Sequence, residues 1–259
     1  MISESIINNV KIIAAQAGAA IMDIYKDESK FNVEHKSDDS PLTAADQAAN
    51  AIIVKGLESL EVSFPIISEE NKLVDYSVRK DYERFWLVDP LDGTKEFIKR
   101  NGEFTVNIAL IEGQEPIFGV VYVPATHEMY WAVKGEGARY TDGIKTTELH
   151  TSTYNMSQSG VRVVCSRSHI NDETQQLMDK LTEPQIVSKG SSLKFLIIAK
   201  GDAELYPRIG PTMEWDTGAA HIILTEAGGT VKQYDGKDPL LYNKKNLLNP
   251  YFIASAAQS

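Results

Sequence analysis

Apolar residues recur at three- and four-residue steps over the first 27 residues, which is the spacing of one face of an α-helix. This stripe predicts an amphipathic helix over residues 3–27. Its members are Ile6, Val10, Ile13, Ala17, Ile21 and Ile24. A second helix is predicted over about 43–61, because Ser40-Pro41 is typical of a helix entry. Its inward residues are Ala45, Ala49, Ile52 and Ile53.

Short runs rich in β-branched and aromatic residues follow, separated by turns that contain Gly, Pro, Asp or Asn. They predict strands at 64–67, 85–88, 104–111, 117–123 and 128–133. The last three runs are spaced like successive hairpins, so this section is expected to be antiparallel. The segment between the first two runs is rich in charge, and we expect it to be a solvated connection.

The pattern changes after Thr151-Ser-Thr. Two further strands are predicted at 161–165 and 185–188, each followed by a helical segment, at about 171–181 and 191–200. The sequence therefore predicts two α/β halves, residues 1–150 and 151–259. No Gly/Ser-rich or Pro-rich linker separates them, so we expect them to pack as one unit.

Composition narrows the class of protein. The 259 residues are 42% hydrophobic and 24% charged, which excludes disordered, collagen-like and disulfide-scaffold proteins. A single cysteine, Cys165, cannot form an intramolecular disulfide, so a reducing compartment is expected and Cys165 is expected to be a buried apolar residue. We expect no signal peptide and no transmembrane segment. A cytoplasmic location follows, and peripheral association with the inner membrane face stays open.

The net charge of −10 argues against a nucleic-acid polymer as the main ligand, because clustered lysines and arginines bind phosphate backbones. A small phosphorylated ligand is compatible with this charge, since a bound divalent cation inverts the local potential.

Carboxylates stand at the ends of two predicted strands. Glu69 and Glu70 follow the run at 64–67, and Asp89 and Asp92 follow the run at 85–88. Side chains at the ends of neighbouring strands can converge, and a third acidic contributor is Asp216, in the first turn of a predicted helix. Clustered carboxylates repel one another unless cations lie between them. Oxygen ligands without Cys or clustered His favour Mg²⁺ or Mn²⁺.

Simpler interpretations exist for the same residues. Asp89 and Asp92 flank Pro90 and precede Gly93, which is a composition typical of a type I turn. Asp216 alone is equally compatible with an acid that stabilises a helix N-terminus. The order and combination of these motifs, rather than any one of them, favours a metal site.

At these residues the chain resembles the inositol monophosphatase superfamily, on Glu69-Glu70, Asp89-Pro-Leu-Asp-Gly-Thr94 and Trp215-Asp216 in this order. Longer matches are similar to its 3'(2'),5'-bisphosphate nucleotidase branch. They are Asp89 to Phe97, Gly190-Ser-Ser-Leu-Lys-Phe195 and Leu205-Tyr-Pro-Arg-Ile-Gly-Pro-Thr212. Matching segments run from Pro41 to Ala254, so the resemblance covers nearly the whole chain.

The resemblance implies an α/β fold, α+β by some schemes, built as a layered α-β-α-β-α sandwich. It implies hydrolysis of a phosphate monoester with two or three Mg²⁺ ions, for which Mn²⁺ is an alternative. The implied metal ligands are Glu69, Asp89, the backbone carbonyl of Leu91, Asp92 and Asp216. Metal ions neutralise the phosphoryl oxygens and lower the pKa of water, which a dianionic ester requires.

The resemblance also implies that Asp46 and Thr94 position the attacking water, with Glu70 near that water or near an additional metal ion. Without the resemblance, Asp46 is better interpreted as a surface acid in a capping-box-like spacing, and Thr94 as a helix N-cap. The backbone N–H groups of Gly93 and Thr94, at a helix start, are suited to binding a phosphate.

Substrate contacts are expected in the second half and, at the metal end, from Gly93, Thr94 and Asp216. Ser191, Lys194 and Arg208 resemble nucleotide-binding residues of the branch, with the cations suited to the phosphate that is retained. Taken alone, Lys194 is better interpreted as a solvated helix residue and Arg208 as a surface residue. His169 is a weaker candidate for a contact to the base, since a lone loop histidine is more often simply exposed.

The implied reaction converts adenosine 3',5'-bisphosphate to AMP and phosphate, and extends to the 5'-phosphosulfate relative, as part of sulfur assimilation. Inhibition by Li⁺ is implied as well. One alternative is an inositol monophosphatase or broad sugar phosphatase, against which stand Lys95-Glu96 in place of Thr-Asn. Another is a catalytically silent nucleotide-binding regulator. The expected partner is a small phosphate ester, and the expected assembly is a monomer or a homodimer.

Overall fold

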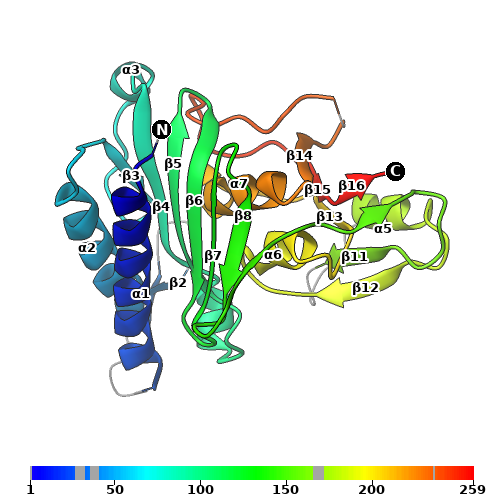
Figure 1. The fold of residues 1–259 in the computed structure, drawn as a ribbon, viewed down its shortest axis with the longest axis horizontal. Helices are drawn as coiled ribbons and strands as arrows, with labels where there is room; N and C mark the ends of the chain where they lie inside the picture. The colour runs from blue at the N-terminus through cyan, green and yellow to red at the C-terminus, as the bar shows by residue number, and fades with distance from the viewer. Residues whose placement is uncertain (1, 27–32, 36–40, 166–171, 236) are drawn as a thin grey trace.

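The protein is layered, as the computed structural model of residues 2–26, 33–35, 41–165, 172–235 and 237–259 shows. Figure 1 displays two N-terminal helices, a large sheet, two central helices, a smaller sheet and an outer helix in succession. The large sheet contains only strands that precede residue 150, and the smaller one only strands that follow it. The expected α-β-α-β-α sandwich is therefore confirmed.

The large sheet has seven strands in the order β3-β4-β5-β6-β7-β8-β9. β3 pairs with β4 in parallel, and every later pair is antiparallel, which confirms the antiparallel section expected from the hairpin-like spacing. The strands are β3 (Ile66–Ser68), β4 (Arg84–Asp92), β5 (Thr105–Glu112), β6 (Glu115–Val123), β7 (Glu128–Val133), β8 (Ala138–Thr141) and β9 (Thr146–Glu148).

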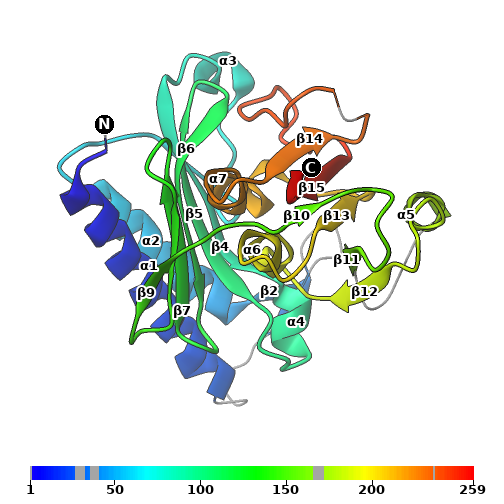
Figure 2. The same cartoon turned by 45° about the vertical axis from the view of Figure 1, so that its right-hand side comes forward.

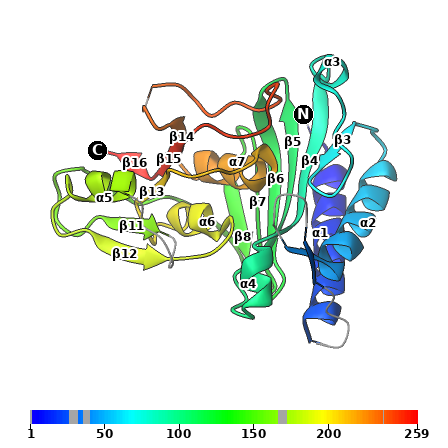
Figure 3. The ribbon, with the colours of Figure 1, turned by 180° about the vertical axis from the view of Figure 1, so that it is seen from behind.

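Helices α1 (Glu4–Lys26) and α2 (Ala44–Glu58) cover the outer face of this sheet (Figure 3). The stripe predicted for the first helix is the face that packs, since Val10, Ile13, Ala17 and Ile21 are buried. Alternate residues of β4–β7 join them in one hydrophobic core. Burial of these apolar side chains, about 25 cal/mol per Å², is what holds both helices on the sheet.

Helix α1 departs from one expectation. By length and composition its 23 residues are apolar enough to cross a membrane, because half-buried alanines and isoleucines flank its buried stripe. The expectation that the chain has no such stretch is therefore wrong for α1 by this measure. In the fold, the helix packs against α2 and the sheet as an amphipathic element.

The inner face of the large sheet packs against α6 (Leu193–Ala199) and α7 (Gly218–Glu226), which lie between the two sheets (Figure 2). Residues of β4, β5, α6 and α7 share a second core, so side chains from both halves bury one another. β4 illustrates the alternation: Phe85 and Leu87 belong to this core, and Trp86 and Val88 to the outer one.

The smaller sheet has the order β12-β11-β13-β15-β14. β11 is parallel to both its neighbours, and β15 is antiparallel to β13 and β14. The bounds are β11 (Arg162–Cys165), β12 (Gln185–Ser188), β13 (Leu205–Arg208), β14 (Thr230–Gln233) and β15 (Phe252–Ser255). Cys165 is buried at the end of β11, as expected.

The remaining elements are short. They are β1 (Val33–His35), β2 (Pro41–Thr43), α3 (Tyr76–Arg79), α4 (Thr94–Ile98), β10 (Thr153–Tyr154), α5 (Asp172–Met178), the 3-10 helix η2 (Glu214–Asp216) and β16 (Ala257–Gln258). The expectation of a solvated connection before β4 is wrong at Arg79, which is buried. Its guanidinium donates to Asn243 Oδ1 at 2.9 Å and to the carbonyl of Lys245 at 2.8 Å.

Candidate active site

The parallel pair β3 and β4 brings the first acidic residues together. Ser68 is registered with Val88, so Glu69 and Asp89 directly follow paired positions. The backbone N–H of Glu69 donates to the carbonyl of Val88 at 3.1 Å. The expected placement at neighbouring strand ends is thus confirmed for Glu69, which directly follows β3, and is wrong for Asp89, which lies inside β4.

The Asp89 to Asp92 segment belongs to a strand, contrary to the simple turn interpretation. β4 continues through Asp92, with Asp89 opposite Asn107, Asp92 opposite Thr105, and a bulge between the two pairs. A bulge re-aims the strand. The Asp89 carboxylate accepts from the N–H of Leu91 at 3.1 Å, which is the local hydrogen bond that Asp commonly makes in such a backbone.

Helix α4 begins one residue earlier than a Thr94 N-cap requires. Gly93 is the N-cap, with a φ of 94° that favours glycine, and Thr94 is the first helical residue. The interpretation of Thr94 as an N-cap is therefore wrong. The Thr94 hydroxyl instead donates to the carbonyl of Leu91 at 3.4 Å, which links two of the expected site residues.

Asp216 ends the 3-10 helix η2, so it precedes α7 and does not lie in that helix's first turn as expected. Its carboxylate accepts from the N–H of Met213 at 2.9 Å. The capping interpretation and the site interpretation therefore both apply to this residue, because a carboxylate has lone pairs left for a second partner.

Five acidic residues form one electrostatic group. The pKa of Asp89 is raised well above its ordinary value by burial and then by the charges of Glu69, Asp92, Asp216 and Asp46. Asp46 is only 1% exposed in α2, so the interpretation of Asp46 as a surface acid is wrong. The fold thus brings acidic residues from distant parts of the sequence close enough to Asp89 for their charges to raise its pKa.

Burial dominates the electrostatics of the other two aspartates as well. It raises the pKa of Asp92 to about 6, opposed by the nearby Lys194 charge and by the Ser192 N–H. It raises the pKa of Asp216 to about 8, with a further contribution from the charge of Asp92. Ionised carboxylates in such a place are costly, and a nearby cation would favour their charged form.

The donor chemistry fits a hard cation, since the group offers only oxygen atoms on mutually repelling carboxylates. Among the described residues, no three Asp, Glu, His or Cys side chains are grouped closely enough to form a complete metal cage. The acidic residues are therefore electrostatic neighbours in this structure.

A cavity of about 530 Å³ opens beside this acidic group. Asp92 and Gly93 from the first half line it together with Ser191, Lys194 and Arg208 from the second. Asp216 and the aromatic rings of Phe195, Tyr206 and Phe252 complete much of the wall. The structure thus brings the expected substrate contacts Gly93, Ser191, Lys194, Arg208 and Asp216 to one place.

Two cationic residues of this cavity, Lys194 and Arg208, are less exposed than they would be on a free surface. Lys194 is 8% exposed, and its ammonium donates to the carbonyl of Ser191 at 3.0 Å, so the solvated-lysine interpretation is wrong. Arg208 is half-buried and donates to the carbonyl of Pro211 at 2.8 Å. Its Nε and the hydroxyl of Ser191 are buried without a hydrogen-bond partner among the described residues.

Unpartnered buried donors at a cavity wall call for an explanation, and a ligand that accepts hydrogen bonds is one. His169 lies outside the described residues. The expected contact between His169 and a base is therefore still a prediction.

A polar cluster next to Asp92 was not predicted from the sequence. The Ser192 N–H donates to Asp92 Oδ2 at 2.5 Å, and its hydroxyl donates to Asn107 Oδ1 at 2.9 Å. Thr105 Oγ1 lies 2.8 Å from the same hydroxyl. A signal was present, since Thr105 and Asn107 are polar residues two apart in a strand whose residues 108–111 are apolar, and so they point to the same face.

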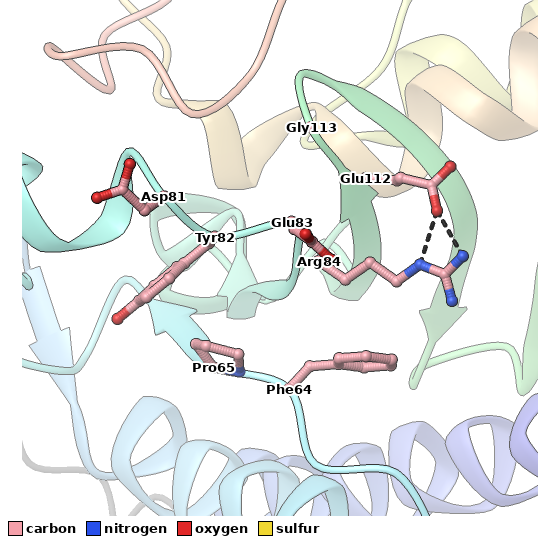
Figure 4. Close-up of a pocket in the computed structure, with 8 residues that line it drawn as sticks. All are labelled: Phe64, Pro65, Asp81, Tyr82, Glu83, Arg84, Glu112 and Gly113. Atoms are coloured by element: carbon pink, nitrogen blue, oxygen red, sulfur yellow. Dashed lines mark hydrogen bonds and ion pairs between the residues drawn. The ribbon is translucent and has the colours of Figure 1, made fainter.

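A larger cavity, of about 740 Å³, lies at the opposite end of β4 (Figure 4). Phe64, Pro65 and Tyr82 line it, and an ion pair between Arg84 and Glu112 borders it. None of the residues expected in the site belongs to this cavity. Size alone does not make it the active site, because the convergent charged groups lie elsewhere.

Comparison with known proteins places these features in context. The model of the Inositol monophosphatase family matches residues 3–258. The chain is 46% identical over 241 residues to the 3'(2'),5'-bisphosphate nucleotidase CysQ of Salmonella typhimurium, which covers 93% of this chain and 95% of that protein. It is 31% identical over 263 residues to the CysQ protein of Haemophilus influenzae, covering 100% of this chain and 95% of that one.

Solved structures agree with this likeness. The crystal structure of CysQ from Bacteroides thetaiotaomicron, a bacterial member of the inositol monophosphatase family, matches with a TM-score of 0.83 at 43% identity, covering 95% of each chain. An IMPase from Thermotoga maritima matches with a TM-score of 0.76 at 26% identity, covering 95% of this chain and 89% of that one.

Proposed function

Because the chain belongs to the inositol monophosphatase family, we infer that it is a metal-dependent 3'(2'),5'-bisphosphate nucleotidase. The substrate we propose is adenosine 3',5'-bisphosphate, which loses its 3'-phosphate to give AMP. The 5'-phosphosulfate relative is a second substrate on the same grounds, and the cellular context is sulfur assimilation. One observation carries the proposal: the cavity joins an acidic group at Asp92 and Asp216 to buried, unpartnered donors on Ser191 and Arg208.

The acidic end of the cavity is the proposed metal centre. Glu69, Asp89, the Leu91 carbonyl, Asp92 and Asp216 would hold two or three Mg²⁺ ions, or Mn²⁺ in their place. Such ions neutralise the phosphoryl oxygens and increase the acidity of water. Burial, together with neighbouring carboxylates, raises the pKa values of Asp89, Asp92 and Asp216, and these raised values support the assignment because bound cations would favour the charged carboxylates.

The proposed reaction is a hydrolysis. A water molecule attacks phosphorus, the bond from phosphorus to the 3'-oxygen breaks, and the 3'-oxygen leaves as a hydroxyl with a proton from the water. The side chains of Asp46 and Thr94 would orient this water. Glu70, which follows the proposed metal ligand Glu69, would lie near the same water or near an additional metal ion. Gly93 and Thr94 would donate backbone N–H groups to the phosphate.

The other end of the cavity is the proposed nucleotide subsite. Lys194 and Arg208 would bind the phosphate that is retained, because a charge-assisted hydrogen bond to phosphate is strong and directional. The Ser191 hydroxyl and the Arg208 Nε would gain the partners that they lack. Asp216 lines the same cavity as Arg208, close enough for the Arg208 charge to lower its pKa.

The identity of the product tests this proposal. Incubation of adenosine 3',5'-bisphosphate with the protein and Mg²⁺ in ¹⁸O-labelled water should give AMP and one labelled oxygen in inorganic phosphate, and EDTA should abolish the reaction. Formation of 3'-AMP would contradict the proposed orientation. An absence of phosphate release from any monoester would instead favour the silent regulator.

Assembly, location and domain organisation are further parts of the proposal. We propose a cytoplasmic enzyme that acts on a small phosphate ester, as a monomer or a homodimer. Peripheral contact with a membrane face is a further part of the proposal, for which the length and apolar composition of α1 are weak support. The division near residue 150 separates two sheets that share a core, so we propose that the halves do not fold independently.

A further inference from the structure

Two turns that bear site residues meet at Glu103, which precedes β5. Gly93 begins α4 directly after Asp92, and Gly190 directly precedes Ser191. A Cβ atom at Gly93 would lie 3.1 Å from the backbone carbonyl oxygen of Glu103, and one at Gly190 would lie 3.0 Å from that same oxygen. The segment with the proposed metal ligands and the segment with the proposed nucleotide contacts therefore pack on one residue.

The Glu103 side chain fixes the second of these turns. Its Oε2 accepts from the backbone N–H of Gly190 at 2.9 Å, and its Oε1 lies 3.6 Å from the ammonium of Lys189. Glu103 is only 9% exposed. A carboxylate bound to a backbone amide in such a place makes a charge-assisted hydrogen bond, which is stronger than a neutral one.

Ser191 needs this support because its backbone is strained. Its φ is 42°, a left-handed conformation that L-residues other than Asn and Asp rarely adopt. Such a conformation persists where the surroundings over-determine it. Here the amide before Ser191 binds Glu103, the amide after it binds Asp92 at 2.5 Å, and its carbonyl accepts from Lys194 at 3.0 Å.

The strained residue also carries a buried hydroxyl without a partner among the described residues. Of its three supports, Asp92 belongs to the proposed metal centre and Lys194 to the proposed nucleotide subsite. Glu103 belongs to neither. We propose that Glu103 is a positioning residue that determines nucleotide specificity, by holding the turn of residues 189–192 so that the Ser191 hydroxyl faces the substrate. This inference rests on the proposed function.

A double-mutant cycle tests it on kcat/KM for adenosine 3',5'-bisphosphate. Glu103→Ala should lower kcat/KM for this substrate about tenfold, mainly by raising KM. It should lower kcat/KM for a small monoester such as p-nitrophenyl phosphate by less than about twofold. In a Ser191→Ala background, Glu103→Ala should leave kcat/KM for the bisphosphate almost unchanged, because Glu103 acts through Ser191. Glu103→Gln should restore most of the loss, since its amide oxygen still accepts from Gly190.

A matched control is Glu112→Ala, which removes an exposed carboxylate from the end of β5. It should leave both substrates unchanged. Glu103→Asp keeps the charge but draws the carboxylate back by one methylene, so it should behave like Glu103→Ala and replaces that variant if the alanine form does not fold.

Hydrogen exchange gives a readout that does not depend on turnover. The Gly190 and Ser192 amides should exchange about tenfold faster in Glu103→Ala than in the wild type or in Glu112→Ala. Three results would overturn the proposal. They are a loss of kcat/KM from Glu103→Ala that adds to the loss from Ser191→Ala, an equal loss of kcat/KM on both substrates, and unchanged exchange of the Gly190 and Ser192 amides. A wild type that does not hydrolyse the bisphosphate contradicts the proposed function instead, and exchange of the Gly190 and Ser192 amides then still tests whether Glu103 holds the turn.

Discussion

Replacing Asp92 with Asn should make the metal-free protein more stable while it removes most of the activity. Burial raises the pKa of Asp92 from 3.8 to about 6. For an acid, a folded pKa above the unfolded one destabilises the folded state at every pH above the folded value. The difference of roughly 2 pK units, at 1.36 kcal/mol each, amounts to about 3 kcal/mol at pH 8.

The Asn side chain should keep the hydrogen bond from the Ser192 N–H, because its amide oxygen occupies the place of Oδ2. The variant should therefore recover about 1–3 kcal/mol of stability, which for a chain of this size corresponds to a rise in Tm of roughly 2–10 °C. Thermal unfolding in EDTA at pH 8 measures it, and phosphate release at saturating Mg²⁺ measures the loss of turnover.

Asp142→Asn is the matched control. The backbone N–H groups of Lys145 and Ile144 lower the pKa of Asp142, so its replacement should not stabilise the protein. A lower Tm for metal-free Asp92→Asn would refute the electrostatic reasoning. Near-native turnover of that variant would refute the assignment of Asp92 as a metal ligand.

Three other predictions concern linkage and specificity. Mg²⁺ at a hundredfold excess over its Kd should stabilise the wild type by about 2.7 kcal/mol in calorimetry, and no shift would argue against a folded-state metal site. Burial lowers the pKa of His221 to about 4, so folding should lose about 2 kcal/mol as pH falls from 7 to 5, and urea unfolding of His221→Gln should show a shallower dependence. Lys194→Ala should lower kcat/KM for the bisphosphate by an amount equivalent to about 1.5–3 kcal/mol of transition-state stabilisation, and should leave kcat/KM for p-nitrophenyl phosphate nearly unchanged. Equal losses of kcat/KM on both substrates would favour a broad phosphatase instead.

Local pattern predicted the elements whose burial is continuous. β4 to β7 are buried on both faces, so their apolar runs were visible. The stripe of α1 was visible because one face of this long helix is buried at three- and four-residue steps. The four-residue strands β13, β14 and β15 were not predicted. Their hydrogen-bond partners lie far away in the sequence, so no local pattern marks the pairing.

The candidate site likewise has residues that the sequence predicted and residues that it did not. Its acidic residues were found because carboxylates in repeated short motifs are conspicuous and carry a resemblance to a family. The supports of that site were not found, because Ser192 meets Asp92 across 100 residues and Glu103 meets Gly190 across 87. Pro90 is compatible with both a turn and a bulged strand, so only the pairing of β4 with β5 distinguishes them.

The most direct test of the central claim is a comparison of kcat/KM for adenosine 3',5'-bisphosphate, inositol 1-phosphate, inositol 1,4-bisphosphate and fructose 1,6-bisphosphate, each with Mg²⁺ and with EDTA. The account predicts that the nucleotide is preferred over each of the other esters by at least about tenfold, since only it uses the donors of Ser191, Lys194 and Arg208, and that EDTA abolishes every rate. A preference for inositol 1-phosphate, or turnover that persists without metal, would contradict it.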